Sequence, residues 1–166
     1  RAIACVSPSK AFNIAGLQIA NIVTPDPDLY QRINRAINDN EVCDVNPFGI
    51  LATIAAYNEG EEWLAQLLDY LYGNYTYMSG FCQEHLPQFP LVQLEGTYLV
   101  WMDCRSTGMT SQALNDRLVA EADLCLNAGS MYGPEGEGFL RWNIACPREK
   151  LREGLERFCR FMTTIR

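Results

Sequence analysis

The sequence has little of what marks metal centres, catalytic triads and membrane spans. It contains no Cys-x-x-Cys pair, and its single histidine, His85, has no serine or cysteine partner that suggests a triad. No apolar stretch approaches the roughly eighteen residues that a membrane-spanning helix needs, and no basic-then-apolar signal segment opens the chain. We therefore expect no metal site and no membrane association, and we interpret His85 as a loop residue.

The cysteines predict no disulfide framework, because they are scattered singly along the chain. Most of them lie within apolar runs, where a thiol behaves as a small buried hydrophobic group. Free buried thiols are typical of a reducing compartment, so the sequence favours a cytoplasmic protein. The seven are Cys5, Cys43, Cys82, Cys104, Cys125, Cys146 and Cys159.

Positive charge is also scarce. The chain has 13 Lys and Arg against 20 Asp and Glu, which gives a net charge of −7. Binding to nucleic acid or to an anionic membrane needs clustered basic residues, so neither partner is expected. The basic residues concentrate in 148–166, where they alternate with Glu149, Glu153 and Glu156 as on a solvated helical face.

What remains is the composition of an ordinary globular protein. The 166 residues are 48% hydrophobic and 20% charged, enough for one domain with a proper core. Two acidic residues, Glu135 and Glu137, lie in a Gly/Pro-rich loop. Nothing in that loop predicts the paired-carboxylate geometry of a glycosidase.

The first half of the chain reads as two strands followed by helices. Residues 2–6 and 17–23 are rich in Ile, Val and Ala, and we expect them to form two buried strands of a parallel or mixed sheet. Asp26-Pro27 and Asn46-Pro47 are typical N-cap and N1 pairs. They predict helices over 27–38 and 48–57, and we expect the second to be deeply buried or to lie at a subunit interface. Glu61 opens a third, longer helix that ends near Gln83 or Glu84 and carries an apolar stripe on its core-facing side.

The second half predicts short strands covered by helices. We expect strands near 92–93, 98–103, 124–127 and 139–145, and helices over 111–121 and from Pro147 or Arg148 to Met162. This order indicates a mainly antiparallel sheet with helices on one face. The predicted fold class is α/β with an α+β C-terminal lobe. Its parts are residues 1–58, a connecting helix over 59–87 and a small domain over 88–166.

A single lysine stands on the turn between the first two strands. Lys10 follows Ser7 and Ser9 in the string Ser-Pro-Ser-Lys-Ala-Phe-Asn-Ile-Ala-Gly, and such turns open toward ligand crevices in α/β proteins. An amine attacks a carbonyl only when it is deprotonated, so a catalytic lysine needs desolvation or a nearby cation. The alternative is an ordinary solvated loop lysine.

The string from Ser7 to Gln18 resembles the Schiff-base lysine segment of fold-type I pyridoxal-phosphate (PLP) enzymes. Within them it is most similar to the class I/II aminotransferase family and its bacterial MalY/PatB-type cystathionine β-lyases. The resemblance implies that Lys10 carries PLP and acts in catalysis. It also implies that Ser7 binds the cofactor phosphate, with Ser9 beside it in the cofactor site.

A second candidate is Arg141, in the predicted strand over 139–145. Alternation puts Arg141 and Asn143 on one face, and a guanidinium fork suits a carboxylate. Alone, the segment could equally be an edge strand with a surface arginine. Residues 138–145 resemble the family segment whose arginine binds the substrate α-carboxylate, and residues 127–133 resemble a loop near the substrate entrance whose glycines permit positive φ.

The resemblance leaves the reaction open. Many aminotransferases have a phosphate-binding arginine where this chain has Gln18, so Gln18 and the Asn13-Ile14-Ala15-Gly16-Leu17 match favour the lyase branch over a transaminase. Asn46-Pro47-Phe48-Gly49 also resembles that branch. Complete enzymes of this fold are more than twice as long. We therefore expect the C-terminal part of a homodimeric PLP enzyme acting on an amino acid, in which the Lys10 amine removes the α-proton. The piece itself is expected to be inactive, and a non-catalytic stand-alone domain is the remaining alternative.

Overall fold

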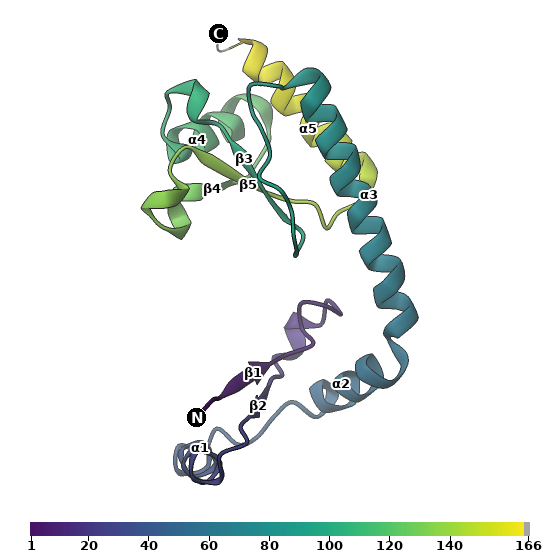
Figure 1. The fold of residues 1–166 in the computed structure, drawn as a ribbon, viewed down its shortest axis with the longest axis vertical. Coiled ribbons are helices and arrows are strands. Elements are labelled where there is room, and N and C mark those ends of the chain that lie inside the picture. Colours follow the sequence, from purple (N-terminus) through teal and green to yellow (C-terminus); the bar gives the residue numbers. More distant parts are fainter. Residues whose placement is uncertain (165–166) are drawn as a thin grey trace. The chain divides into compact units, whose positions relative to one another are not determined.

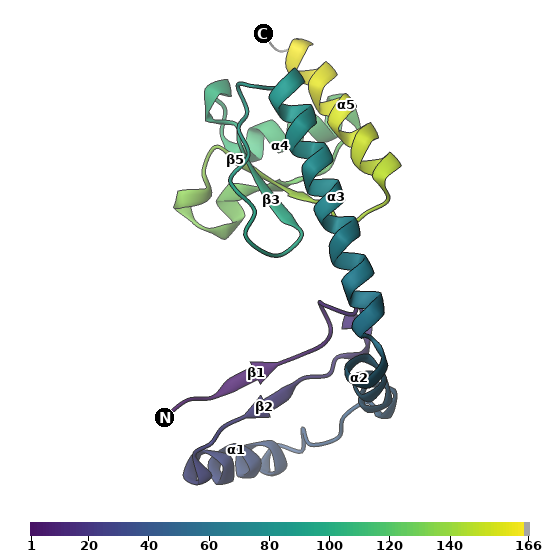
Figure 2. The same ribbon diagram turned by 45° about the vertical axis from the view of Figure 1, so that its right-hand side comes forward.

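The computed structural model describes residues 1–164, and the chain divides into two compact units, Arg1–Leu67 and Leu68–Arg166. The boundary between the units falls within helix α3 (Glu61–His85). Figure 1 labels the helices and strands, and Figure 2 turns the same ribbon.

The first unit starts with a two-stranded antiparallel ribbon. Strand β1 (Ala4–Val6) pairs with β2 (Asn21–Val23), with Ala4 opposite Val23. Both strands are shorter than predicted, and their antiparallel pairing excludes a parallel pair here while agreeing with a mixed sheet. Residues 15–17 instead form a 3-10 turn, and Gln18 has a left-handed φ of 50°, a backbone conformation that ends an extended strand.

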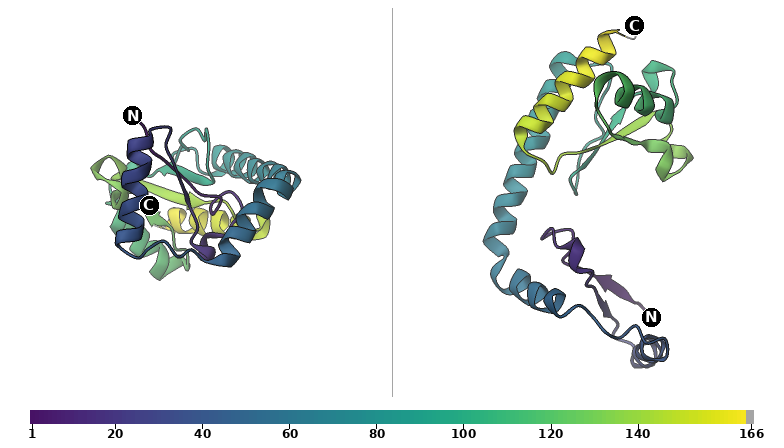
Figure 3. Two further views of the ribbon diagram at one scale, coloured as in Figure 1. Left: turned by 90° about the horizontal axis from the view of Figure 1, so that it is seen from below. Right: turned by 180° about the vertical axis from the view of Figure 1, so that it is seen from behind.

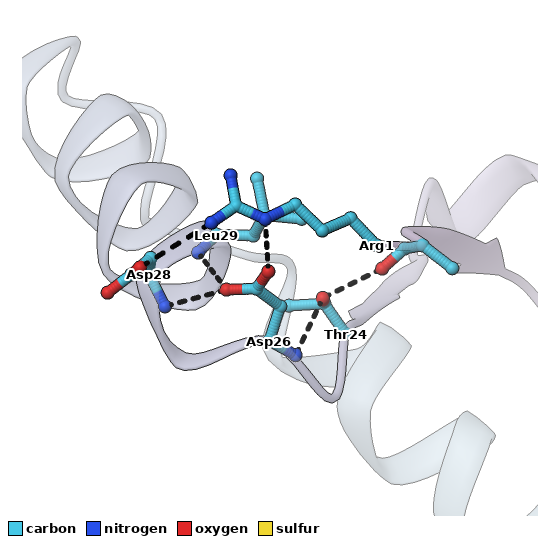
Figure 4. Close-up of polar contacts among 6 residues, drawn as sticks. Arg1, Thr24, Asp26, Asp28 and Leu29 are labelled. Atoms are coloured by element: carbon cyan, nitrogen blue, oxygen red, sulfur yellow. Dashed lines mark hydrogen bonds and ion pairs between the residues drawn. The ribbon is translucent and has the colours of Figure 1, made fainter.

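Helix α1 (Pro27–Asp39) begins at the predicted cap. The Asp26 carboxylate accepts hydrogen bonds from the backbone N–H groups of Asp28 and Leu29, at 2.9 and 3.1 Å. Its other oxygen lies 3.0 Å from Arg1 Nε, and Thr24 Oγ1 accepts from the Asp26 N–H, as Figure 4 shows. The sequence signal of Asp-Pro is therefore confirmed by its hydrogen bonds.

Helix α2 (Pro47–Glu59) begins in the same way, because the Asn46 side chain accepts from the Phe48 N–H at 3.0 Å. The expectation of deep burial is wrong for α2 in this structure. Phe48 is 71% exposed and Leu51 64% exposed, and Gly49 is the one described residue of the helix that is buried. A position at a subunit interface stays a prediction.

The strands of this unit are exposed as well, with Val6 and Val23 at 46% and 55%. This corrects the prediction of buried strands. A two-stranded ribbon with two helices has no second layer broad enough to cover both faces of the ribbon. Its apolar side chains therefore stay open to solvent within this unit.

The second unit contains a three-stranded antiparallel sheet in the order β3 (Leu99–Asp103), β5 (Phe139–Asn143), β4 (Asn127–Ala128). Helices α4 (Ser111–Ala122) and α5 (Arg148–Thr164) complete it, and α5 lies along the C-terminal part of α3 in Figures 1 and 3. The predicted strand at 92–93 is a single bridge between Leu91 and Met102. The strand expected at 124–127 starts later, because Asp123 ends α4 in a left-handed conformation.

One face of this sheet carries the core. Val100, Met102, Leu140 and Trp142 alternate inward from β3 and β5, and all four are buried. Helices from one side cover them, which confirms a mainly antiparallel sheet with helices on one face. The helical core residues include Met78, Cys82, Leu114, Leu118, Leu151, Leu155 and Phe158.

The long helix α3 buries only its later turns. Leu71, Met78 and Cys82 are buried, whereas Leu68 and Tyr72 are 57% and 71% exposed. The apolar stripe predicted as core is therefore core only in part. In the described part of the chain, no helix combines the length and the apolar character needed to cross a membrane.

The thiols are less buried than predicted. Cys82 and Cys104 are buried, but Cys5, Cys43 and Cys125 are exposed, and Cys146 and Cys159 are intermediate. The two buried thiols lie in the core of the second unit. The exposed Cys5 lies in the uncovered ribbon, where an apolar run is no guide to burial because no layer covers it.

Candidate functional site

The turn between β1 and β2 displays Lys10 on a closed backbone loop. Phe12 N–H donates to the Pro8 carbonyl at 2.9 Å, and Ile14 N–H donates to the Ser9 carbonyl at 3.0 Å. Pro8 is fully buried, while Lys10 is exposed. The loop is thus anchored beneath the lysine, and the amine is accessible.

The two serines share hydrogen bonds across this turn. Ser7 Oγ donates to the Ile19 carbonyl at 2.6 Å and accepts from the Ser9 N–H at 3.2 Å. The two hydroxyl oxygens lie 2.8 Å apart. Since the single Ser7 proton serves the Ile19 carbonyl, the Ser9 hydroxyl is the donor of that contact. Both hydroxyls are therefore held close together, within three residues of the lysine.

Aromatic packing supports the same turn. The Phe12 ring lies edge-on to Tyr57 of α2 and stacks on Trp63 of α3, with centroid distances of 6.2 and 6.1 Å. A Cβ on Gly60 would lie 2.5 Å from the Phe12 ring, so glycine is needed there for close approach. The sequence predicted only an apolar core stripe for the helix that opens at Glu61, so the support that Trp63 gives to the lysine turn was not predicted.

This donor set fits PLP by its chemistry. A primary amine in its deprotonated form can condense with the aldehyde of the cofactor, and two neighbouring hydroxyls can rotate to donate to its phosphate. The unit Arg1–Leu67 does not supply the desolvation expected of a catalytic lysine, because Lys10 is exposed there. The backbone N–H and the hydroxyl of Ser7 are hydrogen-bond donors next to a lysine, so this turn is better suited to bind an anion than a cation. No group of three His, Cys, Asp or Glu side chains suited to a metal ion occurs within residues 1–164.

Arg141 lies in the middle strand of the second unit's sheet. In register, Trp101 of β3 is opposite Arg141 on one side and Asn127 of β4 on the other. Directly opposite residues of an antiparallel pair share a face, so the three side chains form a row on the face opposite the core. The edge-strand alternative for Arg141 is wrong, because β5 is central.

The guanidinium of Arg141 has two neighbours and one unpaired donor. Its Nη2 donates to Asn127 Oδ1 at 2.8 Å, and its Cζ lies 4.3 Å from the ring centroid of Tyr132. Its Nε is buried and has no hydrogen-bond partner in the part of the chain that the structure describes. A guanidinium without a carboxylate partner within residues 1–164 can bind an external carboxylate through its outer N–H groups.

The candidate residues fall into two sets. Ser7, Ser9 and Lys10 lie together on one turn of the first unit, whereas Arg141 lies in the second unit. Their roles stay predictions. Sequence analysis missed Asn127 as a partner of Arg141, although the segment 127–133 was noted; the register of β4 with β5 is what brings Asn127 and Arg141 together.

Other expectations about this region can be compared with the structure. Gly133 has a φ of 126°, as the predicted loop requires, but Gly129 is there for close approach: a Cβ would lie 2.2 Å from the Gly136 carbonyl oxygen. Glu137 caps α4 through the Ser111 N–H. His85 ends α3 with its ring 4.6 Å from Phe81 instead of lying in a loop.

Comparison with known sequences gives one family. Residues 1–158 match the family described as Aminotransferase class I and II. The chain is 34% identical over 155 residues to the cystathionine beta-lyase PatB of Bacillus subtilis, and 32% identical over 150 residues to the protein MalY of Escherichia coli. These matches cover 93% and 90% of this chain but 40% and 38% of the relatives, so the chain spans about two fifths of their length.

Several solved structures superpose well on this chain. A PLP-bound putative aminotransferase of Clostridium difficile superposes with a TM-score of 0.91 at 38% identity, covering 95% of this chain and 41% of that one. Cystalysin of Treponema denticola, which contains PLP, gives a TM-score of 0.87 at 29% identity, with 99% and 42% covered. A PLP-bound C-S lyase of Staphylococcus hominis gives 0.84 at 31% identity, with 95% and 41% covered.

Proposed function

Because the chain belongs to the aminotransferase class I and II family, we propose that it forms the lysine-bearing, C-terminal part of a PLP-dependent carbon–sulfur lyase. The observation that carries this proposal is the exposed Lys10 amine on a closed turn, next to the paired hydroxyls of Ser7 and Ser9. The likeness to relatives named as cystathionine β-lyase and C-S lyase supports the choice of reaction.

Each candidate residue has a chemical task in this proposal. Lys10 holds the cofactor through its amine and, once free, takes the α-proton of the substrate. Ser7 and Ser9 donate their hydroxyl protons to the phosphate, and Arg141 holds the α-carboxylate through charge-assisted hydrogen bonds. When bound, PLP supplies an electron sink at the α-carbon.

The proposed reaction is a β-elimination from an amino acid. The α-proton passes to the Lys10 amine, the bond from the β-carbon to sulfur breaks, and the thiolate leaves with that electron pair. Water then converts the remaining three-carbon unit to pyruvate and ammonia. The lysine must therefore reach the α-carbon, and Arg141 limits the orientations in which the substrate can lie.

An aminotransferase is the second candidate. The family description and the putative aminotransferase among the solved relatives favour it. In that case Lys10 would both remove the α-proton and return it, PLP would supply the electron sink and keep the amino group when bound, and the substrate would leave as a keto acid. A stand-alone domain without activity is the third alternative.

We further propose that the substrate is an amino acid and that the enzyme is a homodimer. The exposed apolar side chains of α2 support self-association.

The sequence offers a matched control for testing Lys10, because Lys10 and Lys150 are its two lysines. PLP is titrated into the 166-residue chain, the yellow absorbance band is followed, and the product is fixed with borohydride and mapped by mass spectrometry. We expect the label on Lys10, loss of the band in Lys10→Ala, and no change in Lys150→Ala. Labelling spread over both lysines and the N-terminus would contradict a built site.

The reaction is tested separately from cofactor binding. Cystathionine is supplied with PLP, and pyruvate is measured beside the keto acid expected of a transaminase. Pyruvate that depends on Lys10 supports the lyase, and keto acid without thiol release supports the aminotransferase. A Lys10 band with neither product indicates that these residues bind PLP without completing an active site.

A further inference from the structure

Arg141 is held by two neighbours that leave its charge uncompensated. Asn127 stands opposite Arg141 in register and accepts from Nη2 through a neutral amide oxygen. Tyr132, in the 3-10 turn Gly129–Tyr132 that follows β4, faces the guanidinium with its ring. Trp101 packs edge-on against the Tyr132 ring, with the ring centroids 5.5 Å apart.

A second arginine on the same sheet face shows the contrast. Arg105 makes a bidentate pair with the Asp103 carboxylate, in which Nε donates to Oδ1 at 3.0 Å and Nη2 donates to Oδ2 at 2.6 Å, and its Cζ lies 5.0 Å from the Phe139 ring centroid. Arg105 therefore has an anionic partner within the chain. Arg141 has the same kind of aromatic neighbour but no ion pair with any carboxylate in residues 1–164.

We infer that Asn127 and Tyr132 are positioning residues for Arg141: they fix the plane of its guanidinium while leaving its charge, and the N–H donors at the outer end of the fork, available to an external carboxylate. The inference rests on the proposed role of Arg141 as the carboxylate anchor. The amide of Asn127 accepts one hydrogen bond and adds no negative charge, which an aspartate there would do. The Tyr132 ring attracts the cation through its face without competing for its donors.

The buried Nε explains why positioning matters. Nε is shielded from water and has no acceptor within the described residues, so an external carboxylate would approach the outer N–H groups of the fork, and it would do so only while the guanidinium is held in this plane. A guanidinium that could rotate would bring Nε back to water. With Asn127 and Tyr132 in place, the fork stays aimed in one direction, and the carboxylate arrives at a preformed receptor.

The test follows the Arg141 Nε–H resonance by ¹⁵N NMR in the 166-residue chain, with assignment from Arg141→Lys. L-alanine is the probe, and L-alaninamide, which lacks the carboxylate, is its control. Asn127→Asp is expected to weaken L-alanine binding by about tenfold or more, because the new carboxylate pairs with Arg141. Asn127→Ala is expected to weaken it about fivefold to tenfold.

Tyr132 is tested with a matched pair of variants. Tyr132→Leu is expected to weaken L-alanine binding about twofold to fivefold, whereas Tyr132→Phe keeps the ring and binds as the unaltered chain does. Gln93→Glu adds a negative charge at an exposed position of the same unit and controls for net charge. Circular dichroism spectra are compared to verify that all variants are folded.

Orientation is measured directly, without ligand. The heteronuclear ¹H–¹⁵N NOE of Arg141 Nε should fall in Asn127→Ala and in Tyr132→Leu, while that of Arg105 Nε, held by Asp103, stays constant. Unchanged NOE values together with wild-type binding by Asn127→Asp would overturn the inference. If L-alanine leaves the unaltered chain's Arg141 resonance unmoved, the proposed anchor role fails in this chain, and the NOE values still decide whether Asn127 and Tyr132 position Arg141.

Discussion

The two units of the chain bury their apolar side chains to very different extents. In the unit that starts at Leu68, the strands place Val100, Met102 and Leu140 fully inside, under helices that supply further buried side chains. In the unit that ends at Leu67, the β1–β2 ribbon and most of α2 are exposed. Both units nevertheless have well-capped helices and closed turns.

The difference separates two sources of structure. Caps and turn hydrogen bonds are local, so the Asp26 and Asn46 caps form wherever their few residues are present. Burial requires another layer, and the first unit contains none broad enough. The lysine turn is therefore shaped locally, while the Arg141 row depends on a sheet with a complete core beneath it.

Thiol reactivity should show the largest contrast between the units. Burial raises the pKa of both the Cys82 and the Cys104 thiols to about 12, with a smaller contribution from neighbouring ionisable groups. At pH 8 such a thiol has about a thousandth of the thiolate of an ordinary cysteine, and it is shielded from reagent besides. Cys5 and Cys43 should be alkylated rapidly in the folded chain, whereas Cys82 and Cys104 should be alkylated only after unfolding.

The measurement is alkylation over time, with each cysteine quantified by peptide mass spectrometry in buffer and in urea. In urea, all seven cysteines should react at similar rates. Equal rates for Cys5 and Cys82 in buffer would show that the core of the second unit is open, and the contrast between the units would then be lost.

Two phenylalanines, one in each unit, allow the free-energy contributions of buried and exposed apolar side chains to be compared. Phe158 is fully buried, with its ring 5.6 Å from both Phe89 and Trp142, so Phe158→Ala should lower the free energy of unfolding by about 3–5 kcal/mol. Phe48 is 71% exposed, and Phe48→Ala should change it by about 0.5 kcal/mol or less. Urea unfolding followed by circular dichroism measures both. A large effect of Phe48→Ala in the isolated chain would mean that α2 has a partner in solution, such as a second copy.

Much of the fold could be predicted from the sequence where local signals decide it. The Asp26-Pro27 and Asn46-Pro47 pairs located two helix starts, and the segments predicted as strands at 98–103 and 139–145 contain β3 and β5. The predictions that were wrong concern burial, which depends on whether another layer of structure covers a segment. An apolar run predicts burial only if something covers it, so the exposure of β1, β2 and α2 could not be read from their own residues.

The candidate site divides in the same way. The resemblance pointed to Ser7, Ser9 and Lys10, and one local turn holds all three. The environment of Arg141 was beyond sequence reasoning, because Asn127 is 14 residues away in the chain and meets Arg141 only through the pairing of β4 with β5. Spacing alone does not give the register of two strands that are joined by an irregular loop.

Glu137 provides the smallest expected effect, a change in pH dependence confined to the second unit. Its carboxylate accepts from the Ser111 N–H and from the Gly138 N–H at 3.1 Å, and these hydrogen bonds, Ser111 first, lower the pKa of Glu137 below its usual value. The folded state therefore binds this proton more weakly than the unfolded state does. The stabilisation is complete above the unfolded pKa, about 4.3, and is lost as the pH falls through the lower folded value.

Glu137→Gln keeps an acceptor oxygen but no charge, so its urea midpoint should fall less steeply below about pH 4.3 than that of the unaltered chain. Glu135→Gln is the matched control: Glu135 is exposed, and its variant should keep the original slope. Identical slopes for all three proteins would show that the α4 cap does not depend on the charge of Glu137.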